Sequence, residues 1–130
     1  MRLRGAHAVL ALGLLAATSA SAQGPNLAGV WKVSGKITCI GAVMIVTPTC
    51  TFRQVGGRLG GACVGPNARG PLTGLVAGSK VSWTWRHDAT TTAGISGSTS
   101  FDGTLASAHL ISGAMSSAGL PCKGKFTQTR

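Results

Sequence analysis

Four cysteines constrain the fold of this chain more than any other feature of its sequence: Cys39, Cys50, Cys63 and Cys122. An even number of cysteines in a short chain predicts disulfide bonds, here two, if the chain is exported, and the N-terminus described below indicates that it is. The sequence lacks the paired C-x-x-C spacing that is typical of zinc sites, so we predict disulfides and no metal site. How the cysteines pair depends on the strands that carry them.

The stretch between the second and third cysteines, CTFRQVGGRLGGAC, predicts a β-hairpin. A glycine pair, residues 56–57, lies at its centre, where a two-residue turn needs the positive φ that glycine adopts at little cost. Counting outward from that turn places Cys50 opposite Cys63 in a non-hydrogen-bonded pair, which is close enough for a disulfide. The same count places Phe52 opposite Gly61.

Two further hairpins follow along the chain. A turn at residues 78–79 pairs Gly74 with Trp83, and period-two alternation puts four side chains on one face: Val81, Trp83, Trp85 and His87. The third hairpin is predicted to turn near residues 107–108. In two of the hairpins a large aromatic residue faces a glycine, which is typical of a strongly curved sheet.

These patterns predict an all-β fold of eight antiparallel strands, at about residues 29–38, 49–55, 58–65, 71–77, 80–87, 97–103, 108–116 and 122–129, with a surface loop at 65–71. Such strands close as an up-and-down barrel when the first pairs with the last. A register with Cys39 opposite Cys122 adds a disulfide at this seam and puts Trp31 opposite Arg130. The alternative pairing, Cys39 with Cys50 and Cys63 with Cys122, also fits the sequence.

The N-terminus has the features of a signal peptide. Two arginines precede an apolar stretch at residues 8–17, and small residues ending at Ala22 precede a cleavage site. The apolar stretch is too short to span a bilayer as a helix. We expect residues 1–22 to be removed and residues 23–130 to form one secreted or periplasmic domain without a transmembrane segment.

The predicted mature chain is strongly basic. The whole sequence has twelve Lys and Arg, and loss of the two in the signal peptide leaves ten against Asp88 and Asp102, a net charge of +8. This charge favours contact with an anionic surface, such as lipid headgroups. The basic residues are scattered singly and form no RNA-binding motif, so we predict no nucleic-acid partner.

The segment GVW, residues 29–31, and a basic residue at the end of the last strand resemble the signature of the lipocalins and the wider calycin group of β-barrels. In that family the tryptophan packs across the closed end of the barrel and the arginine covers it. The resemblance gives these roles to Trp31 and Arg130. The segments GSKVSWTW and TSFDGTL are also similar to avidin-type barrels. The lipocalin T-D-Y motif is missing, and we cannot place the residues with which avidins hold biotin, so biotin is not expected as the ligand.

A closed end at Trp31 places the cysteines, Trp85, His87, Met115 and Leu120 near an open mouth. The apolar segment IGAVMIVTP, residues 40–48, either arches over this mouth as a lid or belongs to a longer strand. We predict that a small apolar or amphipathic molecule binds there, with His87 as a polar handle. The side chains expected to supply contact area are Trp83, Trp85, Phe101 and Met115. The alternative is that these side chains simply fill the lumen.

The sequence carries no G-x-S-x-G, H-E-x-x-H or G-x-G-x-x-G motif, so we predict no catalytic residue and no cofactor. Two rival functions use other residues. Because LAGVWKVSG is locally similar to barrel inhibitors of secreted metalloproteases, an inhibitor of a secreted protease would insert residues 23–27 into its partner. A small barrel lyase or isomerase would use His87 as its base, since imidazole titrates near neutrality.

Mass spectrometry of the exported, unreduced protein tests both the processing and the disulfides. We expect a chain that begins at Gln23 and gains four hydrogens on reduction, because each disulfide takes up two. A mass that retains residues 1–22, or one that reduction leaves unchanged, would contradict these predictions.

Overall fold

The computed structural model describes residues 25–119 and 121–130, and the regular elements among them are all β-strands. They are β1 (Gly29–Cys39), β2 (Ala42–Val46), β3 (Thr49–Val55), β4 (Arg58–Val64), β5 (Ala68–Ala77), β6 (Lys80–Ala89), β7 (Gly97–Ser107), β8 (Leu110–Ser117) and β9 (Lys123–Thr129). The predicted signal peptide, Gln23 and Leu120 lie outside the described residues. Within the described ranges, no helix is long and apolar enough to cross a membrane.

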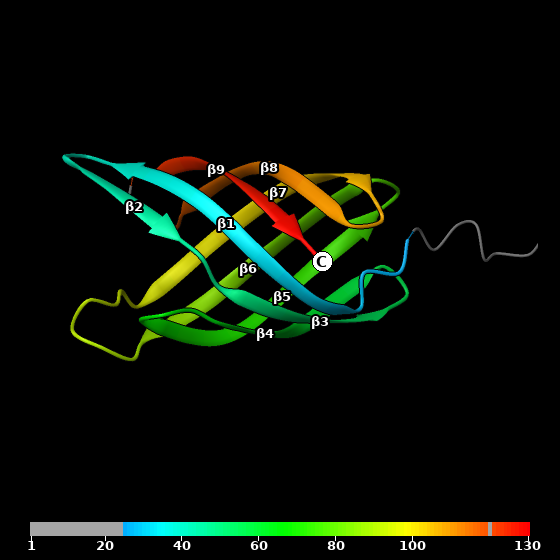
Figure 1. Ribbon diagram of the computed structural model, residues 1–130, viewed down its shortest axis with the longest axis horizontal. Coiled ribbons are helices and arrows are strands. Elements are labelled where there is room, and N and C mark those ends of the chain that lie inside the picture. The colour runs from blue at the N-terminus through cyan, green and yellow to red at the C-terminus, as the bar shows by residue number, and fades with distance from the viewer. Residues whose placement is uncertain (1–24, 120) are drawn as a thin grey trace, which may run out of the picture.

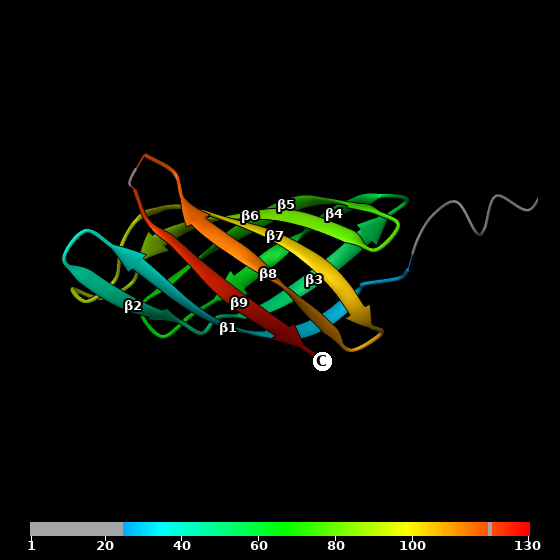
Figure 2. The same cartoon turned by 90° about the horizontal axis from the view of Figure 1, so that it is seen from above.

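The strands form one antiparallel sheet that closes on itself (Figures 1 and 2). From β3 to β9 each strand pairs with the next in the chain, and β9 pairs with β1. On the other edge of β1, residues 29–32 pair with β3 and residues 35–39 pair with β2. Because β2 and β3 share this edge, the strands fill eight positions around the barrel. The predicted eight-stranded up-and-down barrel is confirmed.

The register agrees with the one predicted for the first two hairpins. Phe52 lies opposite Gly61, and Gly74 lies opposite Trp83. Cys50 lies opposite Cys63, and the two form a disulfide. The second disulfide joins Cys39 to Cys122 at the seam. The favoured connectivity is therefore confirmed, and the alternative pairing does not occur.

The third hairpin turns one residue later than predicted. Its turn residues are Ala108 and His109, and β8 begins at Leu110. A bulge between Leu105 and Ser107 adds one residue to β7 and shifts the register. The prediction failed because the sequence around the turn has no glycine to mark its centre.

Residues 68–71 belong to β5, although the sequence predicted a surface loop there. Pro71 lies opposite Ala62 on β4. Towards β6, Arg69 and Leu72 have pairing partners, and the two residues between them have none. Since proline has no backbone N–H to donate, this interruption of the ladder is what allows it inside a strand.

A continuous chain of aromatic rings fills the lumen. Trp31 contacts Phe52 with 6.3 Å between ring centroids, and Phe52 meets the edge of Trp83 at 5.3 Å. Trp83 stacks on Phe101 at 3.9 Å, and Phe101 meets Phe126 at 5.0 Å. All five side chains are buried. An eight-stranded barrel has an interior just wide enough for side chains to fill, and here aromatic rings fill it.

The closed end has the arrangement that the calycin resemblance implies. The guanidinium of Arg130 lies over the Trp31 ring, 4.5 Å from its centroid. The Trp31 indole donates a hydrogen bond to the carbonyl of Leu27. Arg130 also donates to three backbone carbonyls, those of Asn26, Ala28 and Ala108. One side chain thereby joins the last strand to the segment that precedes β1 and to the β7–β8 turn.

Substitution of two neighbouring glycines on β4 tests how closely β4 packs against β3. A Cβ added at Gly61 would lie 1.9 Å from the carbonyl oxygen of Thr51, and Gly61 has a φ of +136°. A Cβ added at Gly60 would meet nothing within 4 Å. We expect Gly61→Ala to lower the free energy of unfolding by several kcal/mol, and Gly60→Ala to change it by about 1 kcal/mol or less. Urea denaturation measures both, and equal losses would contradict the register.

Candidate ligand-binding cavity at the open end

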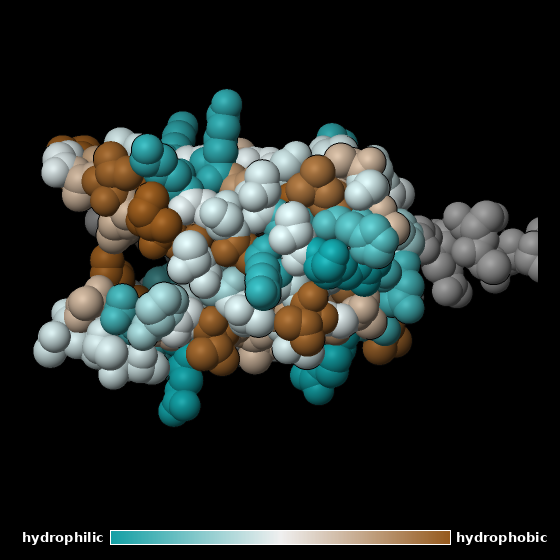
Figure 3. Space-filling view, viewed as in Figure 1, coloured by the Kyte–Doolittle hydropathy of each residue, from teal (hydrophilic) through white to brown (hydrophobic). Residues whose placement is uncertain are grey.

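The barrel wall opens where one of its eight positions is divided between β2 and β3. β4 follows β3 as far as the pairing of Val64 with Thr49. Before Pro48 the chain forms β2, whose strand partner among the described residues is β1 alone. A gap is therefore left between β2 and the β4–β5 loop at residues 65–67. In Figure 3 the molecule is hollowed at this end.

A cavity of about 170 Å³ occupies this opening. Its lining is mainly apolar and includes Ile37, Met44, Val46, Pro48, Ala68 and Trp85. An apolar cavity of about 150 Å³ is large enough to bind benzene. The cavity therefore suits a molecule with one ring or a short aliphatic chain.

The segment predicted as either a lid or part of a strand is a strand that walls one side of the cavity. Side chains alternate along β2, so Met44 and Val46 line the cavity. Val43 and Ile45 face solvent. The turn before β2 continues β1 directly into this strand, which makes residues 29–46 one long hairpin.

Two polar side chains on the cavity wall hydrogen-bond to each other. His87 Nε2 lies 3.0 Å from the hydroxyl of Thr99, and His87 Nδ1 lies 2.6 Å from the carbonyl oxygen of Ile95. A carbonyl can only accept, so Nδ1 carries a hydrogen, and in the neutral ring Nε2 accepts from Thr99. His87 thus ties the β6–β7 loop to the cavity wall.

The indole of Trp85 has an unpaired hydrogen-bond donor. Trp85 packs against His87 with 4.6 Å between ring centroids, and its Nε1 is buried without a partner in the described structure. A buried donor without a partner costs roughly 1–3 kcal/mol. Trp83 Nε1 and the amide of Gln128 are in the same state. Those two side chains belong to the lumen and do not line the cavity.

The structure separates the predicted ligand-binding residues into two groups. Trp85 and His87 line the cavity. Trp83, Phe101 and Met115 are buried deeper in the core and do not line it. Contact between these three and a ligand stays a prediction, and so does any part played by Leu120.

Sequence reasoning missed part of the wall. Thr99 is 6% exposed and lies two residues before Phe101, on the same face of β7. That spacing was a usable signal, since residues two apart on a strand share a face. Ala68 was missed because it was assigned to a loop, and Met44 because the form of its segment was left open.

In the structure, the residues that each rival function would use are already held by other contacts. A general base at His87 would first have to exchange its hydrogen bond with Thr99 for one with a substrate. The segment predicted to enter a protease is held against the barrel where it is described. Leu27 is buried and donates its backbone N–H to Gln54, which in turn donates to the carbonyl of Pro25.

No group of three or more His, Cys, Asp or Glu that could hold a metal ion occurs among residues 25–119 and 121–130.

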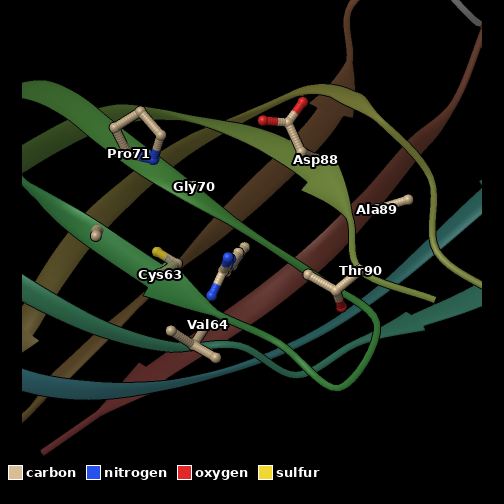
Figure 4. Close-up of a pocket in the computed structure, with 9 residues that line it drawn as sticks. Cys63, Val64, Gly70, Pro71, Asp88, Ala89 and Thr90 are labelled. Carbon is tan, nitrogen blue, oxygen red and sulfur yellow. The ribbon is translucent and has the colours of Figure 1, made fainter.

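A second depression lies on the outer wall across β4, β5 and β6 (Figure 4). Exposed side chains line it, among them Val64, Pro71 and Asp88, and Arg69 lies opposite Asp88. It has no buried donor or acceptor, so we place the candidate site at the open end.

No protein-family model matches the chain, and no curated protein matches it at a significant level. The fold and the cavity therefore carry the functional argument.

The role of His87 in holding the β6–β7 loop against the cavity wall can be tested by removing its hydrogen bond to the Ile95 carbonyl. We expect His87→Ala to speed amide hydrogen exchange in residues 90–96, because it removes one of the hydrogen bonds that join that loop to β6 and leaves, among the described residues, only the one from Ala89 to Ser96. His109→Ala is the control, since His109 is exposed in the β7–β8 turn at the other end of the barrel. Exchange is measured by mass spectrometry of peptic peptides, and unchanged protection in His87→Ala would contradict the role given to this residue.

Proposed function

We propose that this protein binds a small apolar or amphipathic ligand in the cavity at the open end of the barrel. The observation that carries the proposal is the apolar cavity itself, on whose wall lies Trp85, a residue with a buried and unpaired Nε1. Binding sites for small molecules are usually apolar clefts with a few well-placed polar groups. The volume of about 170 Å³ restricts the ligand to roughly the size of a single ring.

The chemistry of the wall specifies the ligand further. An acceptor on the ligand, such as a hydroxyl or carbonyl oxygen, would satisfy the Trp85 donor once a small rotation of the indole turns the buried Nε1 toward the cavity. The remainder of the ligand would contact Ile37, Met44 and Val46 and should be apolar. Charged ligands are disfavoured, because no charged side chain lines the cavity to offset their desolvation.

We further propose that the protein is a calycin-like binding protein that works outside the cytoplasm. The closed barrel and the packing of Arg130 on Trp31 support the first part. The two disulfides support the second, since disulfides persist in oxidising compartments.

The proposal is tested with p-cresol and toluene, which have nearly the same size and differ in one hydroxyl group. The chain has three tryptophans, so its ¹⁵N spectrum should show three indole N–H signals. We expect p-cresol to shift the Trp85 signal and to leave those of Trp31 and Trp83 near their positions. Toluene should bind about tenfold more weakly, because it leaves the Trp85 donor unpaired.

Ala68→Leu fills the cavity and should abolish the p-cresol shift. Ala62→Leu is the matched control, since Ala62 is exposed on the outer face of β4 and should leave binding unchanged. A p-cresol titration that moves none of the three signals, or one that Ala68→Leu leaves intact, would overturn the proposal.

A further inference from the structure

The outer face of the β1–β2 hairpin carries apolar side chains in solvent. Ile40 in the turn is 86% exposed, and on β2 Ile45 is 66% and Val43 is 56% exposed. On β2, Val43 and Ile45 lie on the face opposite Met44 and Val46, and Ile45 also borders the rim of the cavity. Figure 3 shows hydrophobic side chains gathered at this end of the molecule. An exposed apolar group of this kind is typical of an interaction site.

Lysines lie beside this apolar group on the two neighbouring strands. Across the outer face, Ile45 is paired with Lys36, and Lys36 is paired with Lys125 on β9. In the next row toward the turn, Val43 and Lys123 lie on either side of β1. Three lysines and three large aliphatic side chains therefore share one face of the open end.

The positive charge on this face has no carboxylate beside it. Lys36 and Lys125 lie directly opposite each other, which is an unfavourable arrangement for like charges. The nearest acidic residue in the pairing order is Asp102, two strands beyond Lys125 on β7. Asp102 already accepts a hydrogen bond from Ser82. An anionic partner would relieve the repulsion between the two lysines.

We propose that the β1–β2 hairpin docks the protein on an anionic lipid bilayer. The apolar side chains reach the turn at Ile40 and enter the boundary between headgroups and acyl chains. The lysines are set back from the turn and contact the headgroups of the same leaflet. This order of apolar tip and basic flank is the one that interfacial membrane binding requires. The inference is independent of whether the cavity holds a ligand.

Vesicle sedimentation tests the docking. We expect the protein to bind vesicles of equal parts phosphatidylcholine and phosphatidylglycerol and to bind phosphatidylcholine alone far more weakly. The triple variant Lys36→Gln, Lys123→Gln, Lys125→Gln should weaken binding on the order of a hundredfold, because each lysine near an anionic surface contributes about 1 kcal/mol. The triple variant Ile40→Ser, Val43→Ser, Ile45→Ser should also weaken it at least tenfold.

The closed end offers a matched control. Val55 and Leu75 are exposed there, 81% and 61%, near Arg58 and Lys80. The variant Val55→Ser, Leu75→Ser, Arg58→Gln, Lys80→Gln changes side chains of the same kinds and should bind vesicles as the unmodified protein does. All variants should retain the indole spectrum of the folded barrel.

Three results would overturn the proposal. The first is a control variant that loses as much binding as the hairpin variants. The second is a serine variant that binds fully, which would indicate charge attraction without insertion. The third is a concentration-dependent dimer that the serine substitutions abolish while vesicle binding is absent, which would assign this face to a second copy of the chain.

Discussion

The filling of the lumen by aromatic rings is the interaction on which the rest of this structure depends. A barrel of eight strands must close around side chains, and the rings from Trp31 to Phe126 provide a continuous column for it to close around. The wall approaches that column closely where a glycine lies opposite a ring, as Gly61 does for Phe52 and Gly74 for Trp83. A Cβ at Gly74 would lie 2.6 Å from the Cβ of Trp83. A filled lumen leaves room for a ligand only where the wall itself opens.

That opening exists because β2 and β3 are separate strands, divided at Pro48. β3 continues the wall, whereas β2 follows β1 out to the turn and leaves a gap beside the β4–β5 loop. The strand beyond the break then has two different faces. Met44 and Val46 face the proposed ligand, and Val43 and Ile45 face the proposed bilayer. If both proposals hold, an apolar ligand could pass between bilayer and cavity with little exposure to water.

The sequence predicted those parts of the fold that local patterns determine. The glycine pair at 56–57 centres the first hairpin, and alternation then fixes Cys50 opposite Cys63 without knowledge of the other strands. The seam could be predicted because one register satisfies two pairs at once, Cys39 with Cys122 and Trp31 with Arg130.

The features that the sequence did not predict depend on contacts between distant strands. Pro71 reads locally as a loop residue and is tolerated in β5 because pairing with β6 is interrupted beside it. The bulge between Leu105 and Ser107 shows only in the register of β7 with β8, and no local sequence signal marks it. For the site, the pattern identified Trp85 and His87, whose face was clear. It could not separate them from Trp83 and Phe101, because depth along the lumen depends on how the strands are staggered.

The pairing of β1 with β9 also sets the order in which the protein can be completed. Seven residues of β1, Lys32 to Thr38, pair with β9, the last strand of this sheet in chain order. The cysteines of the seam are separated by 83 positions in the chain. The hairpins from β3 to β8 can form as they emerge, but β1 has an unpaired edge until β9 follows. Closure is therefore a late, long-range step, and contacts of this kind are what slow the folding of β-proteins.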